Sequence, residues 1–246
     1  MKRIAHRGIQ TQALENTFAA AQKTFLDPNV AGLEIDVRLT LDKELVVFHD
    51  PTLKRMCGLH ECLSHVVYYA LPPLLDTHPS RQPDRIPRLQ EILDILPADK
   101  ELWLDLKGHD PRLPEQVGKL LLQYPRLHAN LRILLSRKEW TPLLRRHLPS
   151  VDIQLIACYS EEYNTCTPCP RTVQSDKELH DFMDDALQQG VQSIGLEWSP
   201  FISAGIVQLV HNRGLKLCLW EGLPPHGLVD RNTAETLKID YITINI

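Results

Sequence analysis

The feature that most constrains the fold is an alternation of short apolar runs with segments of helical periodicity, repeated along nearly the whole chain. Runs such as LRILL (131–135) and LKLCLW (215–220) are almost continuously apolar, which is typical of parallel strands covered on both faces. The predicted strands are 2–6, 32–37, 102–107, 130–135, 151–158, 193–197, 215–220 and 241–245. Eight strand–helix alternations favour a (β/α)8 TIM barrel of the α/β class over a doubly wound sheet.

Two further patterns define the organisation around those strands. Helices are predicted over 16–27, 89–96, 112–123, a segment closed by Gly190, and 200–213, which Ser199-Pro200 would begin and Gly214 would end. Segment 40–50 predicts a hairpin return directly after the second strand, and residues 51–87 predict an irregular insertion rich in Pro and His. We expect a single domain, residues 1–246, in which this insertion lines part of a substrate pocket.

Composition excludes several classes of protein. The 246 residues suit a barrel of about 250 residues, and a net charge of −4 gives no reason to expect nucleic acid as a partner. No apolar run reaches the roughly 20 residues needed for stable membrane insertion. MKRIA at the start lacks the apolar core of a signal peptide, so a cytoplasmic location is expected. The sequence does not indicate an oligomeric state.

Six cysteines do not change that expectation. The pair Cys166 and Cys169 lies in a Pro-rich segment without the strand-to-helix context of a redox site, and CGLHECLSH (57–65) matches no common zinc spacing. We interpret both clusters as loop residues and buried thiols.

Polar side chains stand where several predicted strands end. They are His6 and Arg7 after the first strand, Glu34 and Asp36 in the second, His49 after the hairpin return, and Asp105 and Lys107 in the third. Residues two apart in a strand point to the same side, so each of the two pairs in the second and third strands shares a face. In a barrel, the carboxyl ends of the strands surround the active site.

This set of residue types suits phosphoryl transfer. Glu34, Asp36 and Asp105 would form an oxygen site for one divalent cation, Mg²⁺ or Ca²⁺, which polarises a phosphoryl oxygen. Arg7 and Lys107 would hold other phosphate oxygens. Two histidines that titrate near neutral pH are candidates for general acid and general base, in either order.

The same residues carry a family resemblance. The stretch AHRG…LENT…LEIDVRLTLDKELVVFHDPTLKR…IPRLQEIL…LWLDLKG, within residues 3–108, resembles the glycerophosphodiester phosphodiesterase family, and LCLWEG resembles a late strand of that family that ends in Trp. The resemblance implies cation-dependent hydrolysis of small glycerophosphodiesters to glycerol 3-phosphate and an alcohol. Carried over, it makes His6 and His49 the acid–base pair, Glu34 and Asp36 metal ligands, and Arg7 and Lys107 phosphate contacts. Asp105 occupies the position of the third metal ligand, and Trp220 is a candidate contact for the glycerol or alcohol part of the substrate.

Departures from the family pattern keep other interpretations open. Asp105 stands where a glutamate is typical, Glu221 replaces the Thr after the late Trp, and TINI replaces an acidic ending. A non-catalytic phosphate-binding barrel is therefore one alternative. A lysophospholipase D is another, since VVYYALPPLL (66–75) could accept an acyl chain. Glu15 is a further candidate, as a residue that orients Arg7 or the metal site. Glu197 is another, as a residue that faces the pocket.

Overall fold

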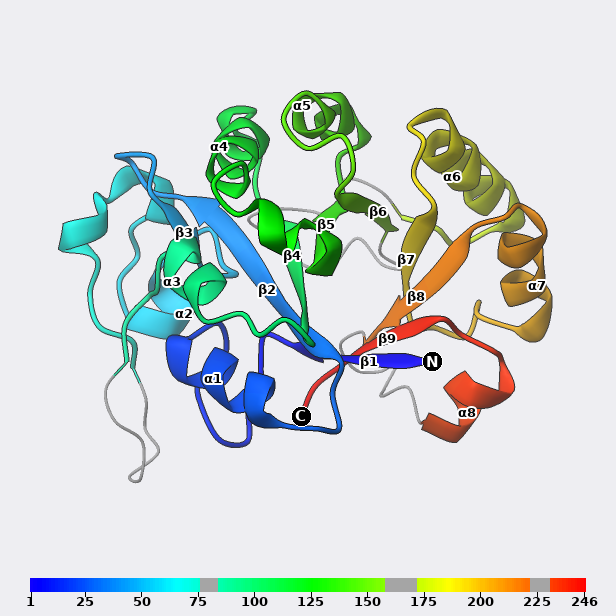
Figure 1. Cartoon of the computed structure of the whole chain (residues 1–246), viewed down its shortest axis with the longest axis horizontal. Helices are drawn as coiled ribbons and strands as arrows, with labels where there is room; N and C mark the ends of the chain where they lie inside the picture. The colour runs from blue at the N-terminus through cyan, green and yellow to red at the C-terminus, as the bar shows by residue number, and fades with distance from the viewer. Residues whose placement is uncertain (76–83, 158–171, 222–230) are drawn as a thin grey trace.

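The chain folds around a closed ring of eight parallel strands (Figure 1). The computed structural model describes residues 1–75, 84–157, 172–221 and 231–246. The ring contains β1 (Lys2–His6), β2 (Gly32–Leu39), β4 (Glu101–Leu106), β5 (Leu131–Leu135), β6 (Asp152–Ala157), β7 (Ser193–Glu197), β8 (Lys216–Trp220) and β9 (Tyr241–Ile244). Their order is β1-β9-β8-β7-β6-β5-β4-β2, and pairing of β1 with β2 closes the ring. The predicted TIM barrel is confirmed.

Helices lie on the outer face of the ring and in the insertion beside it (Figure 1). They are α1 (Phe18–Leu26), α2 (Lys54–Cys57), α3 (Leu89–Asp94), α4 (Arg112–Leu121), α5 (Thr141–Arg145), α6 (Asp176–Gln188), α7 (Ala204–Asn212) and α8 (Arg231–Thr236). Short 3-10 helices are η1 (Leu63–His65), η2 (Tyr68–Ala70), η3 (Pro125–Asn130) and η4 (Lys138–Trp140).

Strand β2 shows how the sequence alternation positions the site. Leu33, Ile35 and Val37 belong to the main apolar core between strands and helices. Glu34 and Asp36 alternate with them and are equally buried, so they occupy the opposite face, inside the barrel. All eight residues of β2 are buried, since one face packs against the apolar core and the other faces the barrel interior.

The layer of the barrel interior next to these carboxylates contains two aromatic rings, packed edge to face, and a cation. The Arg132 guanidinium lies 4.3 Å from the ring centre of Trp103 and 4.1 Å from that of Tyr241. It also pairs with Asp152 at 2.7 Å. Because this layer is packed solid, the polar site can open only at the carboxyl ends of the strands.

Two helix starts differ from the predictions. Asn16 was expected in the first helix but has φ +57° and lies outside it; Thr17 caps α1 by accepting a hydrogen bond from Ala20 N at 3.1 Å. Ser199-Pro200 was expected to begin the later helix, but the cap of α7 is Ser203. In both cases another hydroxyl stands where it reaches the free N–H groups of the first turn.

The hairpin return and the insertion are confirmed for the described residues. Strand β3 (Leu45–Val47) runs antiparallel to the second half of β2, beyond the point where β2 leaves β1. The described parts of 51–87 follow it and end at α3. They pack their own apolar cluster with β3, which consists of Val46, Phe48, Leu53, Met56, Cys57, Leu63, Leu74 and Ile86. The insertion therefore has a core of its own beside the barrel.

Candidate active site

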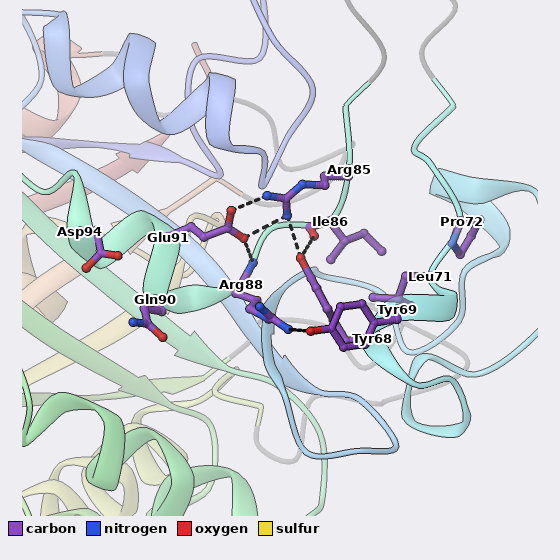
Figure 2. A pocket seen from close by; sticks show the side chains of 10 residues that line it. All are labelled: Tyr68, Tyr69, Leu71, Pro72, Arg85, Ile86, Arg88, Gln90, Glu91 and Asp94. Atoms are coloured by element: carbon purple, nitrogen blue, oxygen red, sulfur yellow. Dashed lines mark hydrogen bonds and ion pairs between the residues drawn. The ribbon is translucent and has the colours of Figure 1, made fainter.

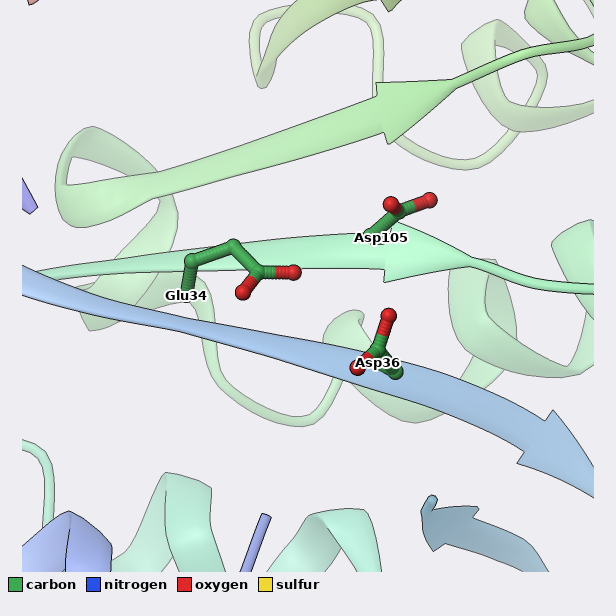
Figure 3. Close-up of side chains that lie close together, drawn as sticks. All are labelled: Glu34, Asp36 and Asp105. Carbon is green, nitrogen blue, oxygen red and sulfur yellow. The ribbon is translucent and has the colours of Figure 1, made fainter. Parts of the chain in front are cut away.

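Three buried carboxylates lie together at the carboxyl end of the barrel (Figure 3). Glu34 and Asp36 come from β2 and Asp105 from the neighbouring β4, where it pairs in register with Asp36. One oxygen of each lies within 4.8 Å of the other two. The parallel register thus brings Asp105 into the group despite its side chain being one methylene shorter than glutamate.

The electrostatics of this trio suit a bound cation. Burial raises the pKa of Glu34 well above its usual range, and the neighbouring carboxylates Asp36 and Asp105 raise it further. The Asp105 Oδ1 atom is buried and has no hydrogen-bond partner among the described residues. Three buried carboxylates with an unsatisfied oxygen are an unfavourable arrangement for the protein alone and a favourable one for a hard divalent cation.

Two cationic side chains border the trio. Arg7 Nε lies 3.1 Å from Asp36 Oδ2, and Lys107 Nζ lies 3.4 Å from Asp36 Oδ1 and pairs with Asp105. Burial alone would raise the pKa of Asp36, but Arg7, His49 and Lys107 hold it well below its usual range. Asp36 is therefore the carboxylate that stays ionised in the group.

The backbone around Arg7 turns sharply so that the strand end reaches the site. Arg7 has φ +57° and Gly8 φ +92°. The Arg7 amide donates hydrogen bonds to the backbone oxygen and to Oε2 of Glu34, at 2.9 and 3.2 Å. A Cβ on Gly8 would lie 2.7 Å from Cβ of Ala20 in α1, so only glycine fits there. Left-handed conformation at a non-glycine residue is a strain that proteins retain at functional sites.

Asn16 is a site residue that sequence reasoning placed in a helix instead. Its Nδ2 donates to Asp36 Oδ2 at 2.8 Å, while its Oδ1 accepts from Asp36 N at 3.1 Å. This two-point contact fixes the Asp36 carboxylate from outside the strand. The signal available in the sequence was an Asn directly before a helix-capping Thr, because Asn tolerates the left-handed conformation.

His49 belongs to a chain of ionic contacts that includes the insertion. Its Nδ1 lies 2.7 Å from Asp50 Oδ1, and Arg38 Nε donates to its backbone oxygen at 2.7 Å. Arg55 from α2 bonds Asp50 and also Glu15, which in turn accepts from Arg7 at 3.1 Å. Glu15 is thus confirmed as a partner of Arg7. Asp50 and Arg55 are contacts that sequence reasoning missed.

His6 is held from the other side of the barrel. Its Nδ1 lies 2.8 Å from Asn245 Oδ1, and its Nε2 lies 3.9 Å from Glu34 Oε2. Burial lowers the pKa of His6 to about 3, helped by the charge of Arg7. Burial likewise lowers the pKa of His49. Both pKa values are thus shifted towards the neutral ring, and in each ring Nδ1 is engaged by an oxygen.

Trp220 and Glu197 lie at the same edge of the barrel. Trp220 ends β8 and is partly exposed, and its register partner on β7 is the buried Glu197. Their positions agree with a pocket wall, and the contact of Trp220 with substrate stays a prediction.

A separate cavity of about 560 Å³ lies between η2 and α3 (Figure 2). Its charged side chains bond one another: Arg85 bonds Glu91 and the Tyr68 hydroxyl, and the Arg88 guanidinium lies 4.2 Å from the Tyr68 ring centre. None of the carboxylates, cations or histidines of the barrel mouth lines it. This cavity is therefore separate from the carboxylate trio.

The cysteine clusters show no competing site in the described part of the chain. There, the carboxylate trio is the one group of three metal-ligating side chains close enough to share an ion, so Cys57, His60, Cys62 and His65 do not form one. Burial raises the pKa of Cys57 to about 11, as for an unreactive thiol. Cys166 and Cys169 lie outside the described residues. No described helix is both long and apolar enough to cross a bilayer.

Curated relatives match about half of the chain. Human lysophospholipase D GDPD1 is 35% identical over 139 residues, which are 53% of this chain and 44% of that protein. Human glycerophosphodiester phosphodiesterase 1 is 31% identical over 133 residues, which are 52% of this chain and 40% of that protein. The chain thus spans about half the length, or less, of these two relatives.

Solved structures share the fold along the chain. A glycerophosphodiester phosphodiesterase from Agrobacterium tumefaciens has a TM-score of 0.70 at 21% identity, covering 99% of this chain and 96% of that one. An Oleispira antarctica phosphodiesterase, solved in complex with its product sn-glycerol-3-phosphate, has a TM-score of 0.71 at 16% identity and covers 99% and 92%. The model of the glycerophosphoryl diester phosphodiesterase family matches residues 6–223. Because this match covers most of the chain, the chain belongs to the glycerophosphoryl diester phosphodiesterase family.

Proposed function

We propose that this protein hydrolyses small glycerophosphodiesters to glycerol 3-phosphate and an alcohol, with the help of one divalent cation. The observation that carries the proposal is the buried trio of Glu34, Asp36 and Asp105 bordered by Arg7 and Lys107. A phosphodiester needs compensation of its negative charge before a nucleophile can approach phosphorus. The product complex of the Oleispira phosphodiesterase supports the same substrate class.

The trio would hold the cation, Mg²⁺ or Ca²⁺, since all its donors are oxygens. When bound, the cation polarises a phosphoryl oxygen and neutralises developing negative charge. Asn16 holds the Asp36 carboxylate in place through its two hydrogen bonds. The Asp105 Oδ1 atom, which has no hydrogen-bond partner among the described residues, would gain a partner in the cation.

The remaining residues either bind the substrate or transfer protons. Arg7 and Lys107 bind the phosphate oxygens, with Arg7 held in place by Glu15. His6 and His49 form the acid–base pair: one takes a proton from the attacking oxygen and the other gives a proton to the leaving oxygen. In both rings Nδ1 is engaged, so Nε2 is the nitrogen left for this transfer. Trp220 packs against the glycerol or alcohol part of the substrate.

A lysophospholipase D activity is the second candidate. It is favoured by the similarity to human lysophospholipase D GDPD1 and by exposed apolar side chains on the insertion. Those side chains are Leu59, Val67, Tyr69 and Leu75. An acyl chain would find there the apolar surface that a small soluble diester does not need. The substrate would be the one partner that activity needs, and no nucleic acid would be involved. The cytoplasmic location stays a prediction.

One assay tests the proposal. Metal-stripped protein is given glycerophosphodiesters and lysophospholipids with Mg²⁺, Ca²⁺ or excess EDTA, and released glycerol 3-phosphate, choline or lysophosphatidate is measured. We expect turnover only with cation, abolished in Asp36→Ala and retained in the exposed control Glu61→Gln. Turnover of lysophospholipids alone would favour the second candidate. Binding of phosphate without any turnover would identify a non-catalytic barrel.

A further inference from the structure

Two residues far from His6 in the sequence form a hydrogen-bonded chain behind it. Asn245 follows β9 and bonds His6 Nδ1 through its side-chain oxygen at 2.8 Å. Glu221 follows β8, is 6% exposed, and accepts from both the backbone N and the Nδ2 of Asn245, at 2.8 and 3.0 Å. Since β8, β9 and β1 are neighbours in the ring, the chain Glu221–Asn245–His6 runs across three adjacent strand ends.

The orientation of the Asn245 amide is determined by its surroundings. Gln10 Nε2 donates to Asn245 Oδ1 at 3.2 Å and to the backbone oxygen of His6 at 3.0 Å. Turning the Asn245 amide over would set its oxygen against the Glu221 carboxylate and its NH₂ against the NH₂ of Gln10. Both contacts would be repulsive, so the Asn245 oxygen has to face the imidazole.

A carbonyl-type oxygen can only accept a hydrogen bond, so His6 must carry its proton on Nδ1 when neutral. Its Nε2 then has a free lone pair, and this is the nitrogen that lies on the side of Glu34 and the carboxylate trio. A ring in the other tautomer would present a proton there instead. The partner of one ring nitrogen therefore decides what the other can do.

We infer that Glu221 and Asn245 are positioning residues for the acid–base chemistry of His6. Asn245 selects the tautomer and ring orientation of His6, and Glu221 selects the orientation of the Asn245 amide. The inference rests on the proposed function, in which His6 Nε2 exchanges a proton with the substrate. The hydrogen bonds between these residues lead to the imidazole, and so both act through His6.

The first experiment reads the tautomer without any turnover. Two-dimensional ¹⁵N–¹H spectra of the cation-free wild-type protein should show His6 with a protonated Nδ1 and an unprotonated Nε2. In Asn245→Leu, where the acceptor is gone, the Nε2-protonated form should appear. A wild-type His6 protonated on Nε2, or an unchanged spectrum in Asn245→Leu, would overturn the inference even if the enzyme is active.

The second experiment exchanges the two polar groups. Asn245→Asp alone sets two carboxylates against each other, and we expect kcat to fall by about 10- to 100-fold with little change in KM, less than the loss of the base itself. Adding Glu221→Gln removes this charge repulsion, but Oε2 of Glu221 accepts from both the backbone N and Nδ2 of Asn245, and one amide group cannot replace both contacts. The double variant Asn245→Asp/Glu221→Gln should therefore recover part of that loss. Absence of recovery in a double variant that folds as wild type does would contradict the chain.

Matched controls separate the possible failures. Asn212→Leu makes the same chemical change at an exposed position on α7 and should leave kcat and the His6 spectrum unchanged. If wild-type protein turns over none of the glycerophosphodiesters or lysophospholipids, the proposed function fails. The tautomer measurement still tests the hydrogen-bonded chain in that case, because it needs no substrate.

Discussion

Replacing Glu34 by Gln is expected to stabilise the cation-free protein while it removes cation-dependent turnover. The oxygens of the trio lie within 4.8 Å of one another. Two unit charges at about that separation repel by roughly 3 kcal/mol at an effective dielectric constant of about 20. Gln removes one of the charges. It also keeps the hydrogen bond from Arg7 N, because its amide oxygen can accept it.

The effect should depend on pH in a defined direction. The pKa of Glu34 is raised in the folded protein, so between the ordinary value of 4.5 and the raised value the folded state binds the proton more tightly than the unfolded state. Stability of the wild type therefore falls as pH rises through that window, by about 1.4 kcal/mol per pH unit. The Glu34→Gln variant has no proton to lose at this position. Its advantage should grow above pH 4.5 until the raised pKa is passed, because burial of the charge and its repulsion by Asp36 and Asp105 both disfavour the ionised wild type.

Urea unfolding from pH 5 to 8 in excess EDTA measures the difference. A second series with added Mg²⁺ or Ca²⁺ should reverse it, since a cation at about 100 times its Kd adds about 2.7 kcal/mol to a protein that binds it. Glu61→Gln, at an exposed position of the insertion, is the matched control and should show neither effect. A Glu34→Gln variant that is less stable than wild type at pH 8 without cation would refute the reasoning.

Three further predictions concern individual residues. Asp105→Glu should keep turnover but change the relative response to Mg²⁺, Mn²⁺ and Ca²⁺, and identical titrations would place Asp105 away from the cation. His6→Ala and His49→Ala should each lower kcat by about 10²–10⁴-fold. If His49 is the general acid, a nitrophenyl leaving group should restore the His49 variant alone; rescue of the His6 variant instead would exchange the roles. Gly8→Ala should lower the free energy of unfolding in urea by well over 1 kcal/mol. The control Gly190→Ala is also at positive φ but has no atom within 4 Å of the added Cβ, so it should lower that free energy by about 1 kcal/mol. Equal losses of stability would contradict the contact with α1.

The sequence by itself determined the architecture and the carboxyl-end location of the main candidates. Near-continuous apolar strands alternating with amphipathic helices leave few arrangements other than a parallel barrel. The two-residue spacing of Glu34 and Asp36 is enough to place both on the same face of their strand. These features are local, since they depend only on strand periodicity and on the direction in which parallel strands run.

Local signals failed at two helix starts. Asn16 has the position of a helix start, yet it lies in a left-handed turn because its side chain bonds Asp36. Ser199-Pro200 has the composition of a helix start, yet Ser203 is the residue whose hydroxyl faces the first turn of α7. Periodicity does not distinguish between two neighbouring caps.

Only the tertiary structure decided which residues support the chemistry. The register of β2 with β4 brings Asp105 beside Asp36, and closure of the ring brings Asn245 and Glu221 behind His6. Those contacts join positions more than 60 and more than 200 residues apart, as their numbers show. Register and ring closure result from packing the whole core at once, and so no single stretch of the sequence contains the information that fixes them.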